Sequence, residues 1–352
     1  MKKMSALLLS LCLFLLCGCS GINISGVSPF RNIRDDSLLS GINDTLDAWV
    51  SDNGISDVSL GVLKGTSAAF ANRGQLNEHS KAGIGQMTGM FTGLLVSNFE
   101  YNSWIDRDQF VDEWINTAGA AVPSYEAESG LSLPSLSMSS PSPDGRLTVG
   151  QLACAVSGLG EFDTFGKSYA TVGMMYNQLD EAGFLFAPSS SVSPSSLGTA
   201  LLCECLRQSY NMNANFVNLI NNQVIVKMDM QESEFEKKDA LAGFDGYQST
   251  VYDLLKAVGY LSGAFDSDEA FEKTVEGALS EVWSDGETSL SLAFNIEQMG
   301  GYTVYTRQGM GDGYSSYIAF VPELDTGISV ICLENTALDD LAGDILSLIL
   351  NA

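Results

Sequence analysis

The chain has 352 residues, and 45% of them are hydrophobic. This composition excludes an intrinsically disordered chain and suffices for one large domain, or two closely packed subdomains, with a hydrophobic core. The formal net charge of −26 excludes nucleic acid as a favourable partner. It also repels an anionic membrane surface, so any membrane attachment requires a lipid.

The N-terminus carries the features of an export signal. Lys2 and Lys3 precede an apolar run, Leu7 to Leu16, which is too short to span a bilayer as a helix. Cys19 follows Gly18 directly, and a small residue before a cysteine at this place resembles a bacterial lipobox. The resemblance implies lipidation of Cys19 and a protein anchored to the cell membrane on its extracytoplasmic side. An ordinary signal peptide cleaved nearby is the alternative.

The first elements of the folded part are predicted from hydrophobic spacing. Ile42 and Leu46 belong to a helical repeat that begins near Asp36 or Ser37, either of which can cap a helix, and that stops at Gly54. This pattern predicts a helix over residues 36–53. Two strands joined by a turn, and then an apolar helix, are predicted over residues 58–63, 67–71 and 87–99.

The middle of the chain is predicted to be mostly helical and interrupted by loops. Val111 and Trp114 are the expected apolar anchors of residues 107–116. Residues 121–145 and 188–196 are rich in Ser and Pro and show no helical or strand periodicity, so both are predicted to be irregular loops. Helices are predicted over residues 197–209 and 249–256.

The C-terminal part returns to strands and closes with an apolar helix, predicted over residues 302–306, 317–321, 327–333 and 339–350. We therefore expect an α/β fold in which an antiparallel sheet is flanked by the N- and C-terminal helices and carries an inserted, mostly α-helical subdomain. The expected parts are a signal peptide in residues 1–19, a tether in 20–35 and a domain in 36–352. Within the domain, the α/β part is expected at about 36–85 and 240–352, and the helical part at about 86–239.

Cysteines and histidine give no sign of a cofactor. Cys154, Cys203, Cys205 and Cys332 show no disulfide spacing, and each is expected to be a small buried apolar residue. His79 is the only histidine of the chain, and no cluster of ligands predicts a metal site. We expect neither a metal nor another cofactor.

The segment Gly85-Gln86-Met87-Thr88-Gly89-Met90-Phe91-Thr92-Gly93 resembles the start of the nucleophile helix of serine β-lactamases and penicillin-binding proteins. That family writes Gly-Ser-x-Ser-Lys-x-Phe-Thr-Gly here. The resemblance implies a Ser that attacks the acyl carbon and a Lys, one turn later, that helps to deprotonate it. In this chain Gln86 replaces the Ser and Gly89 replaces the Lys. Thr88, at the family's second Ser, is the outside candidate for a nucleophile.

Further motifs follow in the order typical of the class C β-lactamase and penicillin-binding group, the β-lactamase-related family. Residues 147–159 resemble the segment that follows the nucleophile helix. Tyr169-Ala170-Thr171 falls where the family carries Tyr-x-Asn, with Thr171 in place of the Asn that binds the substrate amide. Residues 307–317 resemble the strand that supplies a cation and a backbone oxyanion contact; Arg307 retains the cation and Gly309 a glycine.

The resemblance therefore implies a degenerate active site at Gln86, Gly89, Tyr169, Thr171, Arg307 and Gly309. Gln86, Tyr169 and Arg307 are the candidate ligand-binding residues. Gln86 either binds a ligand amide or fills the former pocket. Tyr169 is either a site residue or a buried, hydrogen-bonded aromatic. Arg307 either holds a carboxylate or forms a surface ion pair.

Three functional hypotheses follow. The first is an inactive, lipid-anchored protein that binds a peptide, a cell-wall fragment or a protein partner in the former active-site cleft, since losing a nucleophile and its base costs several orders of magnitude in rate. The second is a divergent serine or threonine hydrolase, a peptidase or esterase, with a relocated nucleophile. The third is a scaffold whose cleft is packed shut by Gln86, Met87 and Met90.

Overall fold

The computed structural model describes residues 28–115, 145–179 and 183–352 of the chain. The predicted signal peptide, Cys19, most of the tether and nearly all of the predicted loop over residues 121–145 lie outside these ranges. Contacts divide the chain into residues 1–31 and 32–352, and the second unit contains the elements described below, apart from Arg31 at the start of β1.

A nine-stranded antiparallel sheet has the strand order β1-β3-β2-β12-β11-β10-β9-β8-β7. Its register places Leu60, Val330 and Tyr317 in one row across three neighbouring strands, and all three side chains belong to the hydrophobic core. The strands are β1 (Arg31–Asn32), β2 (Val58–Lys64), β3 (Ser67–Arg73), β7 (Trp283–Ser284), β8 (Ser289–Leu290), β9 (Asn295–Met299), β10 (Tyr302–Gly311), β11 (Tyr314–Val321) and β12 (Thr326–Cys332).

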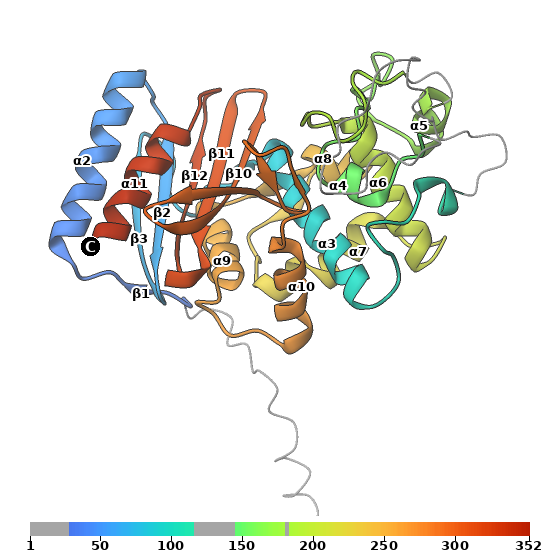
Figure 1. Ribbon diagram of the computed structural model, residues 1–352. Coiled ribbons are helices and arrows are strands. Elements are labelled where there is room, and N and C mark those ends of the chain that lie inside the picture. Colours follow the sequence, from blue (N-terminus) through green and yellow to red (C-terminus); the bar gives the residue numbers. More distant parts are fainter. Residues whose placement is uncertain (1–27, 116–144, 180–182) are drawn as a thin grey trace, which may run out of the picture. The chain divides into compact units, whose positions relative to one another are not determined.

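The terminal helices α2 (Asp36–Asn53) and α11 (Asp339–Asn351) lie together on one face of this sheet (Figure 1). The apolar side chains of both helices belong to the same hydrophobic core as this row of strand residues. The cap of α2 is Asp35, not Asp36 or Ser37: its carboxylate accepts hydrogen bonds from the backbone N–H groups of Ser37 and Leu38, each at 3.0 Å. The helix ends at Gly54, as predicted, in the left-handed conformation.

The opposite face of the sheet packs against α9 (Val251–Ser262). Small residues on the strands allow this close approach, because a Cβ at Gly327 would lie 2.7 Å from Val258. Helices α3 (Gly89–Tyr101) and α10 (Glu269–Leu279) pack against each other, and Ser97 donates a hydrogen bond to the carbonyl of Thr274 at 2.7 Å.

The helical part between β3 and β7 supplies the remaining elements. They are α4 (Val149–Ala153), α5 (Val172–Leu179), α6 (Ser196–Tyr210), α7 (Phe216–Gln223) and α8 (Ala242–Asp245), with a three-stranded sheet of β4 (Ala82–Gly83), β6 (Tyr247–Ser249) and β5 (Glu234–Phe235). Single 3₁₀ turns in this part are η1 (Gly85–Thr88), η2 (Val111–Glu113) and η3 (Ile225–Met228), and a further one, η4 (Pro322–Leu324), lies between β11 and β12. The predicted fold class is confirmed: the antiparallel sheet, its terminal helices and the helical insertion are all present.

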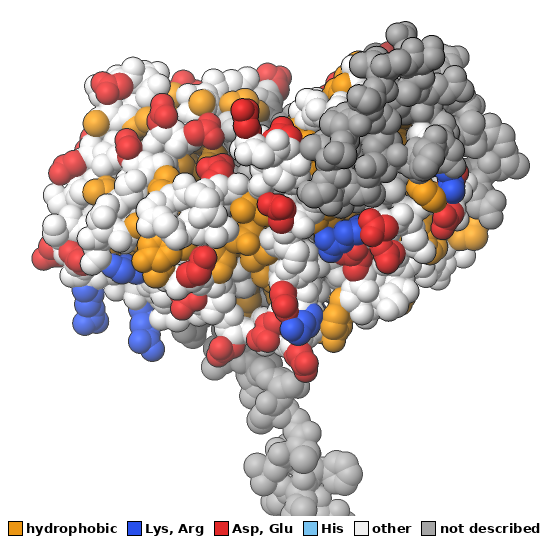
Figure 2. All heavy atoms as spheres, viewed as in Figure 1, with side chains coloured by type: hydrophobic (Ala, Val, Ile, Leu, Met, Phe, Trp, Pro, Cys, Tyr) orange, Lys and Arg blue, Asp and Glu red, His pale blue; other side chains and the backbone are white. Residues whose placement is uncertain are grey.

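Acidic side chains are spread over the visible face of the molecule, with few basic ones among them (Figure 2). The cysteines Cys154, Cys203, Cys205 and Cys332 are buried and unpaired, as predicted. Among the described residues, no group of His, Cys, Asp and Glu side chains is arranged to hold a metal ion. None of the described helices combines the length and the hydrophobicity needed to cross a membrane.

Candidate functional site

The predicted nucleophile segment forms the turn η1 and the first turns of α3. Gly85 has a φ of 55°, and a Cβ there would overlap the carbonyl oxygen of Met310. Gly309 faces the same turn from β10, where a Cβ would overlap the carbonyl oxygen of Ile84. Glycine is therefore required at both positions, because the backbones of η1 and β10 touch directly. Ser316 strengthens this contact by donating a hydrogen bond to the carbonyl of Ile84 at 2.8 Å.

Arg307 reaches from β10 over the beginning of α3. Its Nη2 atom donates a hydrogen bond to the backbone carbonyl of Gln86 at 3.3 Å. A Cβ at Gly89 would lie 2.7 Å from the same nitrogen. The guanidinium thus occupies the volume that any side chain at position 89 needs. The Lys that the family resemblance places there has no room while Arg307 keeps this position.

Arg307 is a cation without a counter-ion in the described part of the chain. Burial lowers the pKa of its guanidinium from 12.5 to about 10, so the group is still charged at neutral pH. Its Nε atom is inaccessible to solvent and has no hydrogen-bond partner among the described residues. The ionisable neighbour is Cys154, and burial raises the pKa of this thiol to about 12, so Cys154 is neutral. Within residues 28–115, 145–179 and 183–352, Arg307 therefore forms no surface ion pair.

The cavity beside Gln86 and Arg307 has a volume of about 20 Å³. A buried water needs at least ~10–15 Å³, so the cavity holds little more than one water molecule. Met87 and Met90 are fully buried but do not line this cavity; Leu202 and Phe244 close it from the helical part. The full lining is Gln86, Gly89, Thr92, Gly93, Leu152, Ala153, Ala155, Pro194, Ser195, Thr199, Leu202, Phe244 and Arg307.

Thr88 does not line the cavity. Its side chain is fully buried, and its hydroxyl oxygen accepts a hydrogen bond from the backbone N–H of Tyr247 at 3.3 Å. A nucleophile must reach an acyl carbon and have a base within hydrogen-bond distance. Thr88 has neither in this structure.

Tyr169 and Thr171 lie apart from the cavity that Gln86 and Arg307 share. Tyr169 is 51% exposed, so the expectation of a buried aromatic side chain is wrong. Pro194 and Ser195, from the helical part, line the cavity beside η1 instead. Ser195 caps α6, since its hydroxyl accepts a hydrogen bond from the N–H of Gly198 at 2.8 Å and donates one to the carbonyl of Gly160 at 2.7 Å.

The sequence analysis missed Pro194 and Ser195 as cavity residues. Ser195 stands directly before the apolar helix over residues 197–209, which is the normal signal of a helix N-cap. That signal predicts that Ser195 begins a helix. It does not predict that this helix begins beside η1, because the two segments are far apart in the sequence.

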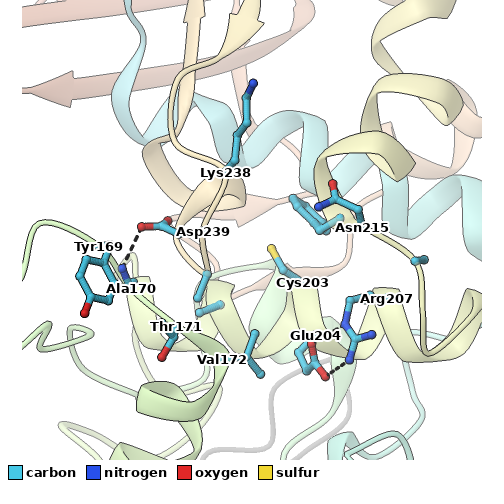
Figure 3. A pocket seen from close by; sticks show the side chains of 14 residues that line it. Tyr169, Ala170, Thr171, Val172, Cys203, Glu204, Arg207, Asn215, Lys238 and Asp239 are labelled. Atoms are coloured by element: carbon cyan, nitrogen blue, oxygen red, sulfur yellow. Dashed lines mark hydrogen bonds and ion pairs between the residues drawn. The ribbon is translucent and has the colours of Figure 1, made fainter.

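Tyr169 and Thr171 line a second cavity of about 400 Å³ (Figure 3). Apolar side chains such as Val172, Ala200 and Phe216 form much of its wall. The two loops at its edge are tied together, because the carboxylate of Asp239 accepts a hydrogen bond from the N–H of Ala170 at 2.8 Å. The remaining lining residues are Ala170, Cys203, Glu204, Arg207, Ala214, Asn215, Lys238, Asp239 and Ala240.

A buried carboxylate, that of Glu204, is among the lining residues of this second cavity. Glu204 is 3% exposed and pairs with Arg207, whose Nη2 lies 2.5 Å from its Oε1. Burial alone would raise the pKa of Glu204, but hydrogen bonds from Arg207, Gln208 and Tyr176 outweigh it and hold the pKa below 4.5. The pair is therefore charged and satisfied, while Lys238 extends away from it in Figure 3.

No protein-family model and no curated protein matches this chain by sequence. Solved structures do match it. A class C β-lactamase shares 16% identity with a TM-score of 0.74, covering 90% of this chain and 98% of that one. A β-lactamase/D-alanine carboxypeptidase from Pseudomonas syringae shares 13% identity with a TM-score of 0.72, covering 90% and 99%. A class C β-lactamase from Rhodobacter sphaeroides shares 13% with a TM-score of 0.70, covering 89% and 99%. The chain therefore has the fold of the class C β-lactamases, the fold that its motifs imply.

Proposed function

We propose that this protein is a lipid-anchored, extracytoplasmic β-lactamase-like protein that binds a ligand and does not hydrolyse it. The observation that carries the proposal is the position of Arg307 over Gly89, which removes the space for the family's Lys. Lipid attachment is proposed at Cys19, on the sequence pattern of the N-terminus.

The chemistry of the first cavity supports the absence of catalysis. Acyl transfer needs a nucleophile, a base within hydrogen-bond distance and room for the acyl group. Gln86 is not a nucleophile, and the hydroxyls of Thr92 and Ser195 donate to backbone carbonyls, those of Gly243 and Gly160. Thr199 also lines the cavity, and its hydroxyl would need a base to act as a nucleophile. The described residues that line the cavity include no carboxylate, His or Lys to act as a base. Its volume of about 20 Å³ leaves no room for a substrate.

The second cavity is the better place for a ligand. Ligand pockets in proteins measure about 300–1,000 Å³ and combine apolar walls with a few polar groups, and this one has about 400 Å³. Tyr169 and Asn215 supply polar groups at the exposed side, while Val172 and Phe216 supply apolar surface. We propose a peptide or cell-wall fragment as the ligand, bound here and not beside Gln86.

The test of inactivity uses the protein from residue 28 onwards with nitrocefin and with a fluorescent penicillin. We expect no turnover of nitrocefin and no covalent labelling by the penicillin. A fluorophosphonate probe examines the divergent hydrolase separately, because it labels any activated Ser or Thr. Labelling that disappears in Thr88→Ala would overturn the proposal of inactivity.

The test of binding uses fluorophore-labelled soluble muropeptides and fluorescence anisotropy. Tyr169→Ala removes a side chain of the second cavity and should weaken binding about tenfold, which corresponds to ~1.4 kcal/mol. Tyr101→Ala is the matched control, because Tyr101 is 49% exposed and does not line either cavity. Equal affinity of the wild type and Tyr169→Ala, or no binding by the wild type, would contradict the proposed site.

A further inference from the structure

A third cavity, of about 290 Å³, adjoins the second one. Asn215 and Lys238 line both cavities, so the two share a wall. Figure 3 shows Tyr169 and Asn215 on opposite sides of the second cavity. The groove formed by the two cavities therefore begins at Tyr169, passes Asn215 and continues along α7, and we call it the amide groove. Ligand pockets in proteins measure about 300–1,000 Å³, so this groove offers room for a ligand of more than one unit.

Side-chain amides of α7 line the third cavity. Asn215, Asn218 and Asn221 lie three positions apart and therefore on one face of the helix. The side-chain oxygen of Asn215 caps the helix by accepting a hydrogen bond from the N–H of Asn218 at 3.0 Å, which leaves the amino group of Asn215 unused among the described residues. The side chains of Asn218 and Asn221 make no hydrogen bond to another described residue. The three amides thus present free donors to the groove, and two of them also present free acceptors.

Helix stability does not explain these asparagines. Asn is one of the weaker helix formers, because its side chain competes for the hydrogen bonds of the backbone. The eight residues of α7 nevertheless include Asn218, Asn221 and Asn222. A planar amide carries two donor hydrogens and an acceptor oxygen, which match a hydroxyl group or another amide. A ligand with such groups gives Asn218 and Asn221 the hydrogen bonds that the described part of the chain does not supply.

The charge of the amide groove is nearly balanced. The charged side chains that line it are Glu204, Arg207, Glu234, Lys238 and Asp239. Glu204 pairs with Arg207, and Glu234 pairs at 2.7 Å with Lys81, which does not belong to the lining. Lys238 and Asp239 are sequence neighbours of opposite sign. In a chain whose net charge is −26, this balance favours an uncharged ligand over an ionic one.

Apolar surface lies beside the amides. Val172 and Phe216 are half-buried and line the second cavity, and Tyr169 exposes an aromatic ring at its edge. A sugar ring has an apolar C–H face that packs on such surfaces, and hydroxyl groups at its rim that need polar partners. An N-acetyl group adds an amide and a methyl group to the same ring. Free amides, apolar surface and balanced charge together match this chemistry.

We propose that the amide groove binds an oligosaccharide of N-acetylated amino sugars. One sugar ring lies against Tyr169 and Val172 in the second cavity, and an acetamido group of a following unit pairs with Asn218 and Asn221 in the third. This inference rests on the second cavity as the ligand site proposed above. It names the glycan, and not the peptide, as the part of the ligand that is bound.

The first test measures the binding of tetra-N-acetylchitotetraose, a glycan without peptide, labelled with fluorescein at its reducing end. The full-length protein, purified in detergent, should bind it in fluorescence anisotropy. The double variant Asn218→Ala/Asn221→Ala should weaken binding by about tenfold or more. Its Tm should not fall below that of the wild type, because alanine is the better helix former. Asn222→Ala is the matched control, with a change of less than about twofold, because Asn222 is exposed on the same helix and lines neither cavity.

The second test uses unlabelled competitors and the labelled muropeptides in parallel. Cellotetraose is a glucose tetramer without acetamido groups, so it should compete about tenfold or more weakly than tetra-N-acetylchitotetraose. Muropeptide binding that depends on Tyr169, without any binding of the chitotetraose, would overturn the glycan assignment and leave the proposed ligand site intact. No binding of either probe would overturn both. Equal affinity of Asn218→Ala/Asn221→Ala and Asn222→Ala, or equal competition by cellotetraose, also overturns the assignment.

Discussion

The Nη2 atom of Arg307 lies 2.7 Å from the point that a Cβ of residue 89 would occupy, so Arg307 and Gly89 share one volume. Arg307 can hold this position because residue 89 is a glycine and has no side chain. The two residues are therefore coupled, although 218 positions separate them in the sequence. This coupling links the start of α3 to the strand β10.

A double-mutant cycle at these two positions should show a change of sign. Gly89 has the helical φ of −58°, so alanine fits its backbone. With Arg307 present, Gly89→Ala forces the tip of the flexible Arg307 side chain to move, so it should destabilise the protein by up to about 1 kcal/mol. In an Arg307→Ala background the same change should stabilise it by about 0.5–1 kcal/mol, because alanine is the better helix former. Urea unfolding measures all four proteins, and additive effects would contradict the shared volume.

Replacing Gly85 by alanine should destabilise the protein far more than the same change at a glycine that has this backbone conformation but no close neighbours. Gly85 and Gly65 have φ values of 55° and 57°. A Cβ at Gly65 meets nothing within 4 Å, whereas one at Gly85 overlaps the backbone of Met310. Gly65→Ala should cost about 1–2 kcal/mol for the left-handed conformation alone. Gly85→Ala should cost at least ~2 kcal/mol more; equal losses in denaturant unfolding would argue against direct contact between η1 and β10.

The charged pair under the second cavity should make stability depend on pH. Glu204→Gln should destabilise the protein by about 1–3 kcal/mol at pH 7, because Arg207 loses its partner in a largely buried place. The folded pKa of Glu204 lies below its ordinary value of 4.5. The stability that its carboxylate contributes is therefore complete above pH 4.5 and is lost as the pH falls through the lower, folded value.

Wild type and Glu204→Gln should accordingly differ most at pH 6–7 and converge at strongly acidic pH in chemical denaturation. Glu276→Gln, in the exposed pair with Lys273, is the control and should show no measurable effect. A difference between wild type and Glu204→Gln that stays constant down to pH 3 would argue against a depressed pKa.

The buried thiols should not react while the protein is folded. The protein from residue 28 onwards contains four cysteines, all of them buried. Burial raises the pKa of Cys154 to about 12 and that of Cys332 to about 11, and it raises the pKa of Cys203 and Cys205 further. Because the thiolate is the reactive form, an aromatic disulfide reagent at pH 8 should label none of them in the native state and all of them in urea. Ala337→Cys places a thiol on the surface and should react at once; fast labelling of the native wild type would contradict this burial.

The sheet and its terminal helices could be predicted because their patterns are local. The spacing of Ile42 and Leu46 predicts α2 with its observed bounds, and the β-branched run after Gly327 predicts β12 to within a residue. The short strands β7, β8 and β9 were not predicted. Asn295–Met299 has no buried residue in its pattern, so its pairing with β10 depends on the neighbouring strand and not on its own hydrophobicity.

For the candidate site, the sequence predicted the helix or strand on which a residue lies, but not which residues lie together in space. Gln86 and Gly89 lie on the predicted helix start, and Arg307 lies on the predicted strand that faces it. Tyr169 could not be placed, because a single exposed Tyr followed by two small residues carries no information about which helix its loop contacts. The filling of the cavity by Leu202 and Phe244 likewise results from packing between segments far apart in the sequence.

The shared volume of Arg307 and Gly89 also limits which changes these two positions can accept one at a time. A lysine at position 89 fits only if the Arg307 guanidinium first moves out of the space that both side chains would need. Substitutions at the two positions therefore depend on each other, although one residue lies at the start of α3 and the other on β10.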